Sequence, residues 1–95
     1  MPTYEASPEF FDSHKELTAA QRREFRAAVD KFIVDLRAGK GFRKGLRVKR
    51  IKGWPGIYEM TWAPNGRAAF QFGTPVTPGE AHIIWHVVGD HSIFP

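Results

Sequence analysis

Three segments in the C-terminal half of the chain alternate apolar and polar residues, and this pattern constrains the fold more than any other feature. Residues 57–62, 67–72 and 81–88 place apolar side chains at every second position: Tyr58, Met60 and Trp62, then Ala68, Phe70 and Phe72, then Ile83, Trp85 and Val87. Successive side chains of a strand point to opposite faces of a sheet. The pattern therefore predicts an antiparallel sheet with one apolar face that packs against other elements.

The opposite face of the same segments is polar and carries reactive side chains. It holds Glu59, Thr61, Arg67, Ala69, Gln71, His82, Ile84 and His86. Carboxylate, guanidinium and imidazole groups are the groups that acid–base and phosphoryl chemistry uses. We therefore look for candidate functional residues on this polar face.

The N-terminal half carries the signals of two consecutive helices. Ser7 is followed by a proline and an acid, which predicts a helix over residues 8–17. Thr18 and Gln21 have the spacing of a capping box, so a second helix begins there, and Gly39 and Gly41 end it. The apolar residues of the second helix recur at three- and four-residue steps, at Phe25, Ala28, Val29, Phe32, Ile33 and Leu36. This spacing predicts an amphipathic helix.

These elements predict an α+β fold. We expect a short N-terminal strand, a two-helix hairpin on the apolar sheet face, and then an antiparallel meander of about four strands that begins with residues 46–51. The turn over residues 63–66, with Asn-Gly at its centre, is a strong hairpin signal. Because such a turn brings Glu59 and Arg67 to facing positions, a cross-strand ion pair is the simple structural explanation for both residues.

Length and composition restrict the class of protein. At 95 residues, the chain is expected to form one domain over residues 1–95. It has no cysteine, which excludes disulfides and thiolate metal sites. No segment contains the ~20 apolar residues that span a bilayer, and the N-terminus does not read as a signal peptide. We therefore expect a cytoplasmic protein that has no membrane partner.

The basic residues are concentrated in one segment. Residues 40–52, KGFRKGLRVKRIK, contain seven basic residues and no acid, whereas Arg67 is the one Lys or Arg between residue 53 and the C-terminus. Two explanations fit such a segment, namely a solvated loop and a stripe that binds phosphates.

The polar face matches the needs of metal-independent RNA cleavage. Attack of a 2′-hydroxyl on the adjacent phosphate needs a base, an acid and cations that stabilise the charged phosphoryl group. Glu and His supply the first two, Arg and Lys supply the third, and no metal or other cofactor is required. A metal site formed by His82, His86 and His91 with an acid is the alternative. Strand geometry separates these histidines and no HExxH spacing is present, which disfavours the metal site.

The order of elements and three stretches of sequence resemble one protein superfamily. The stretches are GLRVKRIKGWPGIYEMTW, the following GRAAFQFG and the closing IIWHVVGDHSIF. With the predicted layout, they resemble the RelE/ParE superfamily of toxins from toxin–antitoxin systems over essentially the whole chain. The resemblance implies a cognate antitoxin as partner, and contact with operator DNA only through the antitoxin complex. RelE-like members act at the ribosomal A site and cut mRNA without metal, whereas ParE-like members poison DNA gyrase.

The resemblance assigns contacts with RNA or the ribosome to the basic segment. Lys49, Arg50 and Lys52 match the basic strand that meets RNA in RelE-like members. The predicted binding set also includes two further basic residues and one histidine of the polar face: Lys44, Arg47 and His86.

The resemblance also assigns catalytic roles. Arg67 matches the strand arginine that holds the scissile phosphate, and Glu59 resembles the carboxylate base of some members. His91 matches a near-terminal histidine of several nuclease members. A tyrosine often follows in that region, but Phe94 stands there in this chain and cannot exchange a proton. The proton transfers are therefore left to His91 or Glu59.

Three functions stay open from the sequence. The first is a ribosome-dependent mRNA endonuclease toxin, with ribosome and mRNA as partners, which the polar face and the basic segment favour. The second is a ParE-like gyrase poison. The third is a toxin-fold protein without catalytic activity that serves only as a binding partner. The same scaffold serves several of these functions, so fold alone does not choose between them.

Overall fold

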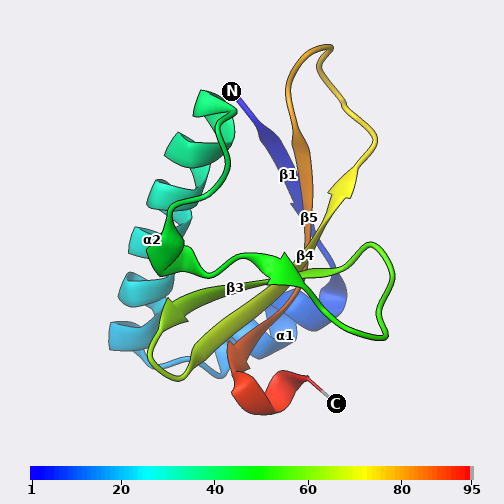
Figure 1. The fold of residues 1–95 in the computed structure, drawn as a ribbon. Helices are drawn as coiled ribbons and strands as arrows, with labels where there is room; N and C mark the ends of the chain where they lie inside the picture. Colours follow the sequence, from blue (N-terminus) through cyan, green and yellow to red (C-terminus); the bar gives the residue numbers. More distant parts are fainter. Residues whose placement is uncertain (95) are drawn as a thin grey trace.

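A five-stranded mixed sheet and two helices form the protein, and the computed structural model describes residues 1–94 (Figure 1). The elements are β1 (Thr3–Ala6), α1 (Pro8–Lys15), α2 (Ala19–Ala38), the 3-10 turn η1 (Lys44–Leu46), β2 (Lys49–Arg50), β3 (Tyr58–Ala63), β4 (Gly66–Gly73), β5 (His82–Asp90) and the 3-10 turn η2 (His91–Ile93). The strand order is β1-β5-β4-β3-β2. Strand β1 is parallel to β5 and the other pairs are antiparallel. The predicted α+β fold is confirmed.

The two helices begin where the capping signals predict. The hydroxyl of Ser7 accepts the backbone N–H of Phe10 at 3.1 Å, and both hydrogen bonds of the Thr18–Gln21 capping box are present. Helix α1 ends at Lys15 rather than at residue 17, because the chain must leave the helix before the cap of α2. A left-handed Gly39, with φ of 69°, ends α2 as predicted.

The core lies between α2 and one face of the sheet. Phe32 at its centre is 1% exposed. Its ring centroid lies 4.8 Å from that of Phe42, 5.0 Å from Phe70 and 5.4 Å from Trp85. Met60 and Ile83 are buried in the same cluster, so the predicted apolar face is confirmed for most of its length.

A β-bulge in β5 changes which residues face the core. Phe70 pairs with Trp85 while its neighbour Ala69 pairs with Val87, so His86 is an extra residue on β5. The alternation reverses there, and Val88 is buried in place of the predicted Val87. Helix α1 satisfies the bulged backbone: Ser7 donates to the His86 carbonyl at 2.9 Å, and the Ser13 hydroxyl accepts the Val88 N–H at 3.1 Å.

Phe72 is a second departure from the predicted apolar face. It is 43% exposed, near the end of β4 where the strand runs into the long β4–β5 loop (Figure 1). Its ring lies beside the core, at centroid distances of 5.4 Å from Tyr58 and 5.7 Å from Phe70.

Strand β2 is much shorter than predicted. Only Lys49 and Arg50 pair with β3, whereas residues 46–51 were expected to form a strand. Leu46 is drawn into the core at 4% exposure by the η1 turn, and Arg47 then adopts a left-handed conformation with φ of 47°. A residue in that conformation cannot continue a strand.

The β3–β4 turn is also shifted from its predicted form. Ala63 pairs with Gly66, so Pro64 and Asn65 form the turn and Gly66 already belongs to β4. The Trp62 ring explains the need for glycine there, because a Cβ on Gly66 would lie 2.5 Å from ring atoms of Trp62.

Candidate functional site

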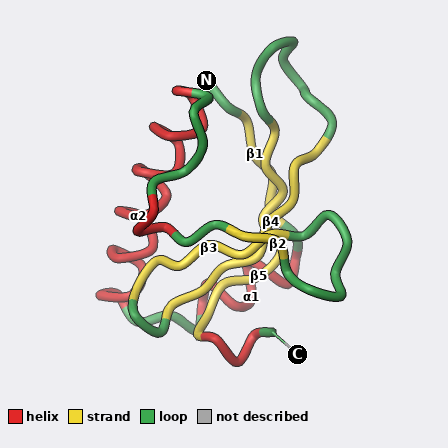
Figure 2. Tube along the Cα trace, in the orientation of Figure 1, coloured by secondary structure: helices red, strands yellow, loops and turns green. Residues whose placement is uncertain are grey.

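The face of the sheet away from α2, here called the open face, carries a row of directly paired residues. Lys49 pairs with Glu59, Glu59 with Ala69, and Ala69 with Val87, so the row crosses β2, β3, β4 and β5. Directly paired residues project to the same side of a sheet. The loop of residues 51–57 extends from the sheet on the side away from α2 (Figure 2).

An ion pair occupies the β2–β3 end of this row. The Nζ of Lys49 lies 3.3 Å from an Oε1 atom of Glu59. The Glu59 side chain is 13% exposed and that of Lys49 is 65% exposed, so the carboxylate is held within the surface while the ammonium faces solvent. A pair of this kind contributes ~0–1 kcal/mol to stability. The ion pair therefore contributes little to stability, and its main consequence is that it fixes the position of the Glu59 carboxylate.

Arg67 does not face Glu59, so the predicted cross-strand pair is wrong. Thr61 pairs with Arg67, because the register of β3 shifts between Thr61 and Ala63 beside the short turn. Glu59 and Arg67 are diagonal neighbours instead, at a Cβ separation of ~7–8 Å that long side chains can cross. Both residues lie on the open face.

The Arg67 guanidinium is anchored on the β3–β4 turn. Its Nη1 donates to the carbonyls of Ala63, Pro64 and Gly66 at 3.3, 3.3 and 2.9 Å. Within residues 1–94, its Nε and Nη2 bind no protein acceptor. Since a guanidinium carries five N–H donors, Arg67 keeps donors for a phosphate while one nitrogen fixes its position.

His91 lies on the η2 turn at the same end of the sheet. Its Nδ1 donates to Oδ1 of Asn65 in the β3–β4 turn at 2.5 Å. This bond leaves Nε2 as the reactive nitrogen of the ring. Asp90 caps η2 by accepting from the backbone N–H and the hydroxyl of Ser92, and these bonds lower the pKa of Asp90 below its ordinary value.

The η2 turn folds over the open face. Gly89 pairs with Arg67, and a Cβ on Gly89 would lie 2.7 Å from Cγ2 of Ile93. Ile93 therefore covers the position that a side chain on residue 89 would take. His91 and Arg67 are in this way brought to one corner of the open face, next to the β3–β4 turn.

The other two predicted polar-face histidines have different partners. His86, the bulged residue, donates from Nε2 to Oε1 of Gln71 at 2.6 Å. His82 is buried at 7% exposure, with Nδ1 2.7 Å from the Thr3 hydroxyl and Nε2 2.8 Å from Oε1 of Glu5. These bonds tie β1 to β5, which is a structural role.

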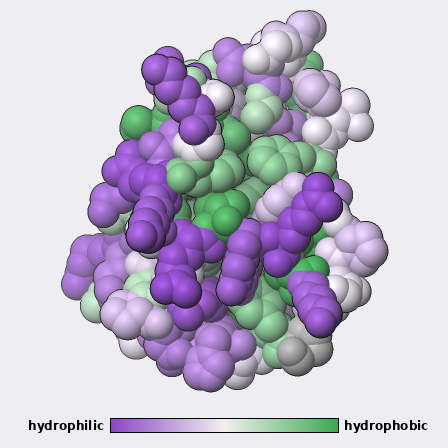
Figure 3. Space-filling view, in the orientation of Figure 1, coloured by the Kyte–Doolittle hydropathy of each residue, from purple (hydrophilic) through white to green (hydrophobic). Residues whose placement is uncertain are grey.

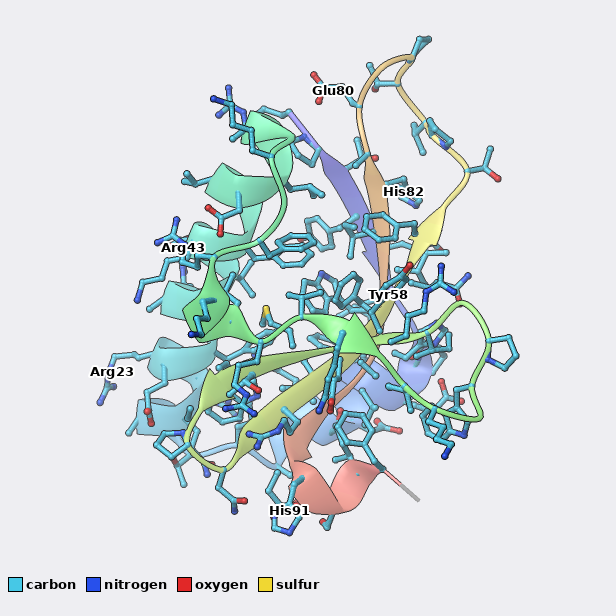
Figure 4. The ribbon with its side chains drawn as sticks, in the orientation of Figure 1. Arg23, Arg43, Tyr58, Glu80, His82 and His91 are labelled. Atoms are coloured by element: carbon cyan, nitrogen blue, oxygen red, sulfur yellow. The ribbon has the colours of Figure 1, made fainter. Side chains whose placement is uncertain are left out.

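The histidines of the alternative metal site do not converge. Figure 4 shows His82 and His91 at opposite ends of the protein. Among the residues that the structure describes, no group of three or more His, Asp or Glu side chains is arranged to hold a metal ion.

The basic segment forms an exposed surface over η1, β2 and the following loop. Hydrophilic side chains cross the molecule there in Figure 3. The exposed basic residues of this surface are Lys44, Arg47, Lys49, Arg50 and Lys52. Lys49 and Arg50 project to opposite faces, since Lys49 pairs with Glu59 and Arg50 lies over the Tyr58 ring, 5.8 Å from its centroid. The segment thus borders both faces at the β2 edge of the sheet.

Sequence reasoning missed two residues of this region. Asn65 was interpreted only as a turn residue, but its side chain binds His91. Trp54 lies in the loop of residues 51–57, where its ring meets the ring of Phe94 edge to face at 6.4 Å. No local pattern signals either contact, because each joins segments that are distant in the sequence.

Comparison with known proteins rests on structure. No protein-family model matches the sequence, and no curated protein matches it. A chain of the DinJ–YafQ toxin–antitoxin complex of E. coli superposes with a TM-score of 0.65 at 14% identity, over 97% of this chain and 94% of that chain. The YoeB/ParE toxin from Agrobacterium tumefaciens gives a TM-score of 0.67 at 11% identity, over 94% and 98% of the two chains.

A third similar structure comes from the RelB–RelE antitoxin–toxin complex of Methanococcus jannaschii. It superposes with a TM-score of 0.59 at 18% identity, over 95% of this chain and 98% of that chain. The chain has the RelE/ParE toxin fold. The predicted resemblance is confirmed at the level of fold.

On this RelE/ParE scaffold, the open face brings together three kinds of group. Glu59 is a carboxylate held by Lys49, Arg67 is an anchored guanidinium with donors to spare, and His91 is an imidazole with Nε2 as its reactive nitrogen. A base, a cation and an acid on one surface can together transfer protons and stabilise a charged phosphoryl group.

No helix among the described residues is long and apolar enough to cross a bilayer.

Proposed function

We propose that this protein is the toxin of a toxin–antitoxin pair and that it cleaves mRNA on the ribosome, in the cytoplasm and without a metal. The observation that carries the proposal is the Lys49–Glu59 pair beside Arg67 and His91 on one face of the sheet. The fold supports the toxin assignment, since similar structures are toxins solved in complexes with antitoxins. Its partners are then an antitoxin, the ribosome and mRNA, with operator DNA contacted only through the antitoxin complex.

The proposed reaction uses the open face as follows. The Glu59 carboxylate accepts the proton of a 2′-hydroxyl, and the freed oxygen attacks the adjacent phosphorus. The bond from phosphorus to the 5′-oxygen breaks, and the leaving oxygen takes a proton from Nε2 of protonated His91. The products are a 2′,3′-cyclic phosphate and a 5′-hydroxyl, so atoms and charge balance. Arg67 and Lys49 stabilise the negative charge that accumulates on the phosphoryl oxygens.

The resemblance to nucleases with a C-terminal tyrosine does not extend to Phe94. Its ring packs against Trp54 at a centroid distance of 6.4 Å and has no proton to exchange. The proposed reaction therefore assigns no proton transfer to it. Glu59 and His91 supply both transfers from opposite sides of Arg67.

The decisive experiment measures mRNA cleavage on programmed ribosomes and gyrase supercoiling at the same protein concentration. Cleavage that persists in a chelator and falls by a factor of about 10² or more in Arg67→Ala supports the proposal. Arg23→Ala is the matched control, because Arg23 is exposed on the outer side of α2, away from the open face (Figure 4). Inhibited supercoiling with intact mRNA would assign the protein to the gyrase poisons. If the protein neither cleaves mRNA nor inhibits supercoiling, it would be a toxin-fold protein that serves only as a binding partner.

A further inference from the structure

Trp54 is placed differently from the other two tryptophans. Trp62 and Trp85 are buried at 9% and 6% exposure within the core, whereas Trp54 is half-buried in the loop of residues 51–57 and lies outside the core cluster. Leaving a large aromatic ring partly in solvent forgoes the stabilisation of its burial. A tryptophan in this position therefore needs an explanation beyond packing.

Backbone hydrogen bonds close the loop that carries Trp54. Its ends are closed by the Ile51 N–H donating to the Ile57 carbonyl at 2.9 Å. The backbone of Trp54 makes two more bonds, donating to Ile51 and accepting from Ile57, each at 3.1 Å. Gly53 and Gly56 supply the left-handed turns, with φ of 87° and 79°. The indole is thus presented by a loop whose backbone is hydrogen-bonded, and such preorganisation reduces the entropy cost of binding.

One face of this loop borders a cavity of about 340 Å³ on the open face. Its lining residues are Glu9, Trp54, Ile57, His86 and Val87. Three of them are apolar or aromatic and two bring hydrogen-bonding groups. Since Nε2 of His86 donates to Gln71, Nδ1 is the acceptor of the neutral ring. A largely apolar wall that includes the indole of Trp54 suits a planar heterocycle such as a nucleobase.

The cavity adjoins the residues of the proposed reaction. Val87 ends the paired row that begins with Lys49 and Glu59. At the usual strand spacing, Glu59 and Val87 lie about 10 Å apart, two strands across the face. Lys49 is exposed just before the loop and Lys52 is exposed within it. A basic edge next to a partly exposed aromatic ring is the arrangement with which proteins bind single-stranded nucleic acids.

We propose that this cavity binds a nucleobase of the RNA strand, next to the scissile phosphate, by stacking on Trp54. The proposal rests on the proposed function and adds a binding site to it. Lys49 and Lys52 contact the adjoining phosphates.

The test measures binding of a short 2′-O-methyl RNA, which cannot be cleaved because it lacks the attacking hydroxyl, by fluorescence anisotropy without ribosomes. Trp54→Ala is expected to raise Kd by about 5- to 150-fold, the range for loss of one stacked base. Trp54→Phe keeps an aromatic face and is expected to retain most of the affinity. Phe11→Ala is the matched control, because Phe11 is an exposed aromatic residue on α1 that lines a different cavity.

An abasic substitution in the RNA separates stacking from an indirect effect. If Trp54 stacks on one base, removing that base should weaken binding to the wild type and leave binding to Trp54→Ala unchanged. Equal effects of the abasic substitution on both proteins would overturn the proposal, as would unchanged affinity in Trp54→Ala. The proposal would also fail if Phe94→Ala, which keeps Trp54, weakened RNA binding as much as Trp54→Ala does. Trp54 would then serve only to anchor the C-terminal segment.

The same experiment distinguishes failure of this proposal from failure of the proposed function. If Arg67→Ala abolishes cleavage while Trp54→Ala binds RNA normally, the cavity proposal fails and the nuclease proposal stands. If RNA binds through Trp54 but mRNA on ribosomes stays intact, the nuclease proposal fails while the base-binding site is supported.

Discussion

The helix-covered face of the sheet and the open face differ in how many contacts hold each side chain. On the covered face, Trp85 meets the rings of Phe10, Phe25, Phe32 and Phe70 at centroid distances between 5.4 and 6.2 Å. On the open face, Glu59 forms an ion pair with Lys49, and His91 forms a hydrogen bond with Asn65. Removing one partner therefore perturbs many contacts on the covered face and few on the open face. Stability and the proposed chemistry are therefore carried by separable sets of residues.

The largest expected effect is on the open face. His91→Gln should reduce mRNA cleavage on programmed ribosomes by about 10² to 10⁴, because the amide cannot exchange the proton that the imidazole transfers. The exposed side chain makes no core contact, so the melting temperature should stay near that of the wild type. Cleavage at the wild-type rate would remove His91 from the mechanism.

His82→Gln is the matched control for that variant. His82 is buried and binds Thr3 and Glu5 across the β1–β5 pair. Its loss should lower the melting temperature, while cleavage by the folded fraction is retained. If both histidine variants behaved alike, the separation of stability from chemistry would be broken.

The second prediction concerns the covered face. Phe32→Ala should lower the free energy of unfolding by about 3 to 5 kcal/mol, since it removes a fully buried ring and leaves a cavity among other rings. Denaturant unfolding measures the change. Phe72→Ala is the control, because Phe72 is 43% exposed at the margin of the core and should cost much less. Similar losses from both variants would contradict the proposed difference in contacts.

The fold was predictable where local signals act alone. The Thr18 capping box, the left-handed Gly39 and the alternation through Met60 and Ile83 each follow from residues near one another in the chain. The bulge at His86 was not predictable in this way. It depends on Ser7, the N-cap of α1, which binds the His86 carbonyl, and on Ser13 of α1, which binds the Val88 N–H. A tertiary contact therefore decided which of two adjacent valines enters the core.

The candidate site was predictable only in part for the same reason. Alternation correctly placed Glu59, Arg67 and Lys49 on one face, since each pairs with a neighbouring strand. The pairing of Glu59 depended on the register of a short turn and was predicted wrongly. Asn65 and Trp54 were missed as site residues, because their contacts with His91 and Phe94 join distant segments.

The third prediction examines the edge where the two faces meet. Lys49→Ala combined with Arg50→Ala should flatten the dependence of log Kd for single-stranded RNA on log salt by about two contacts, or roughly 0.7 in slope for each. The two residues project to opposite faces, so the single variants report each face separately. Arg23→Ala on α2 should leave the slope unchanged. An unaltered slope in the double variant would assign the basic segment to solubility.

The smallest expected effect concerns an exposed ion pair outside both faces, between the end of α2 and the basic segment. The Asp35 carboxylate accepts from the side chain of Arg43 at 2.9 Å, and this hydrogen bonding lowers the pKa of Asp35 from its ordinary 3.8 to about 2. A lowered carboxylate pKa stabilises the folded state above pH 3.8 and ceases to do so as the pH falls through about 2.

Arg43→Ala should therefore lower the melting temperature slightly at pH 7, and the gap from the wild type should close as the pH approaches 2. The control is Arg37→Ala, which removes an exposed arginine from the last turn of α2. A gap that is equal at both pH values would mean that Arg43 acts through packing of its side chain rather than through the charge of Asp35. Because the pair is exposed, the gap should also shrink in high salt, whereas the loss in Phe32→Ala should not.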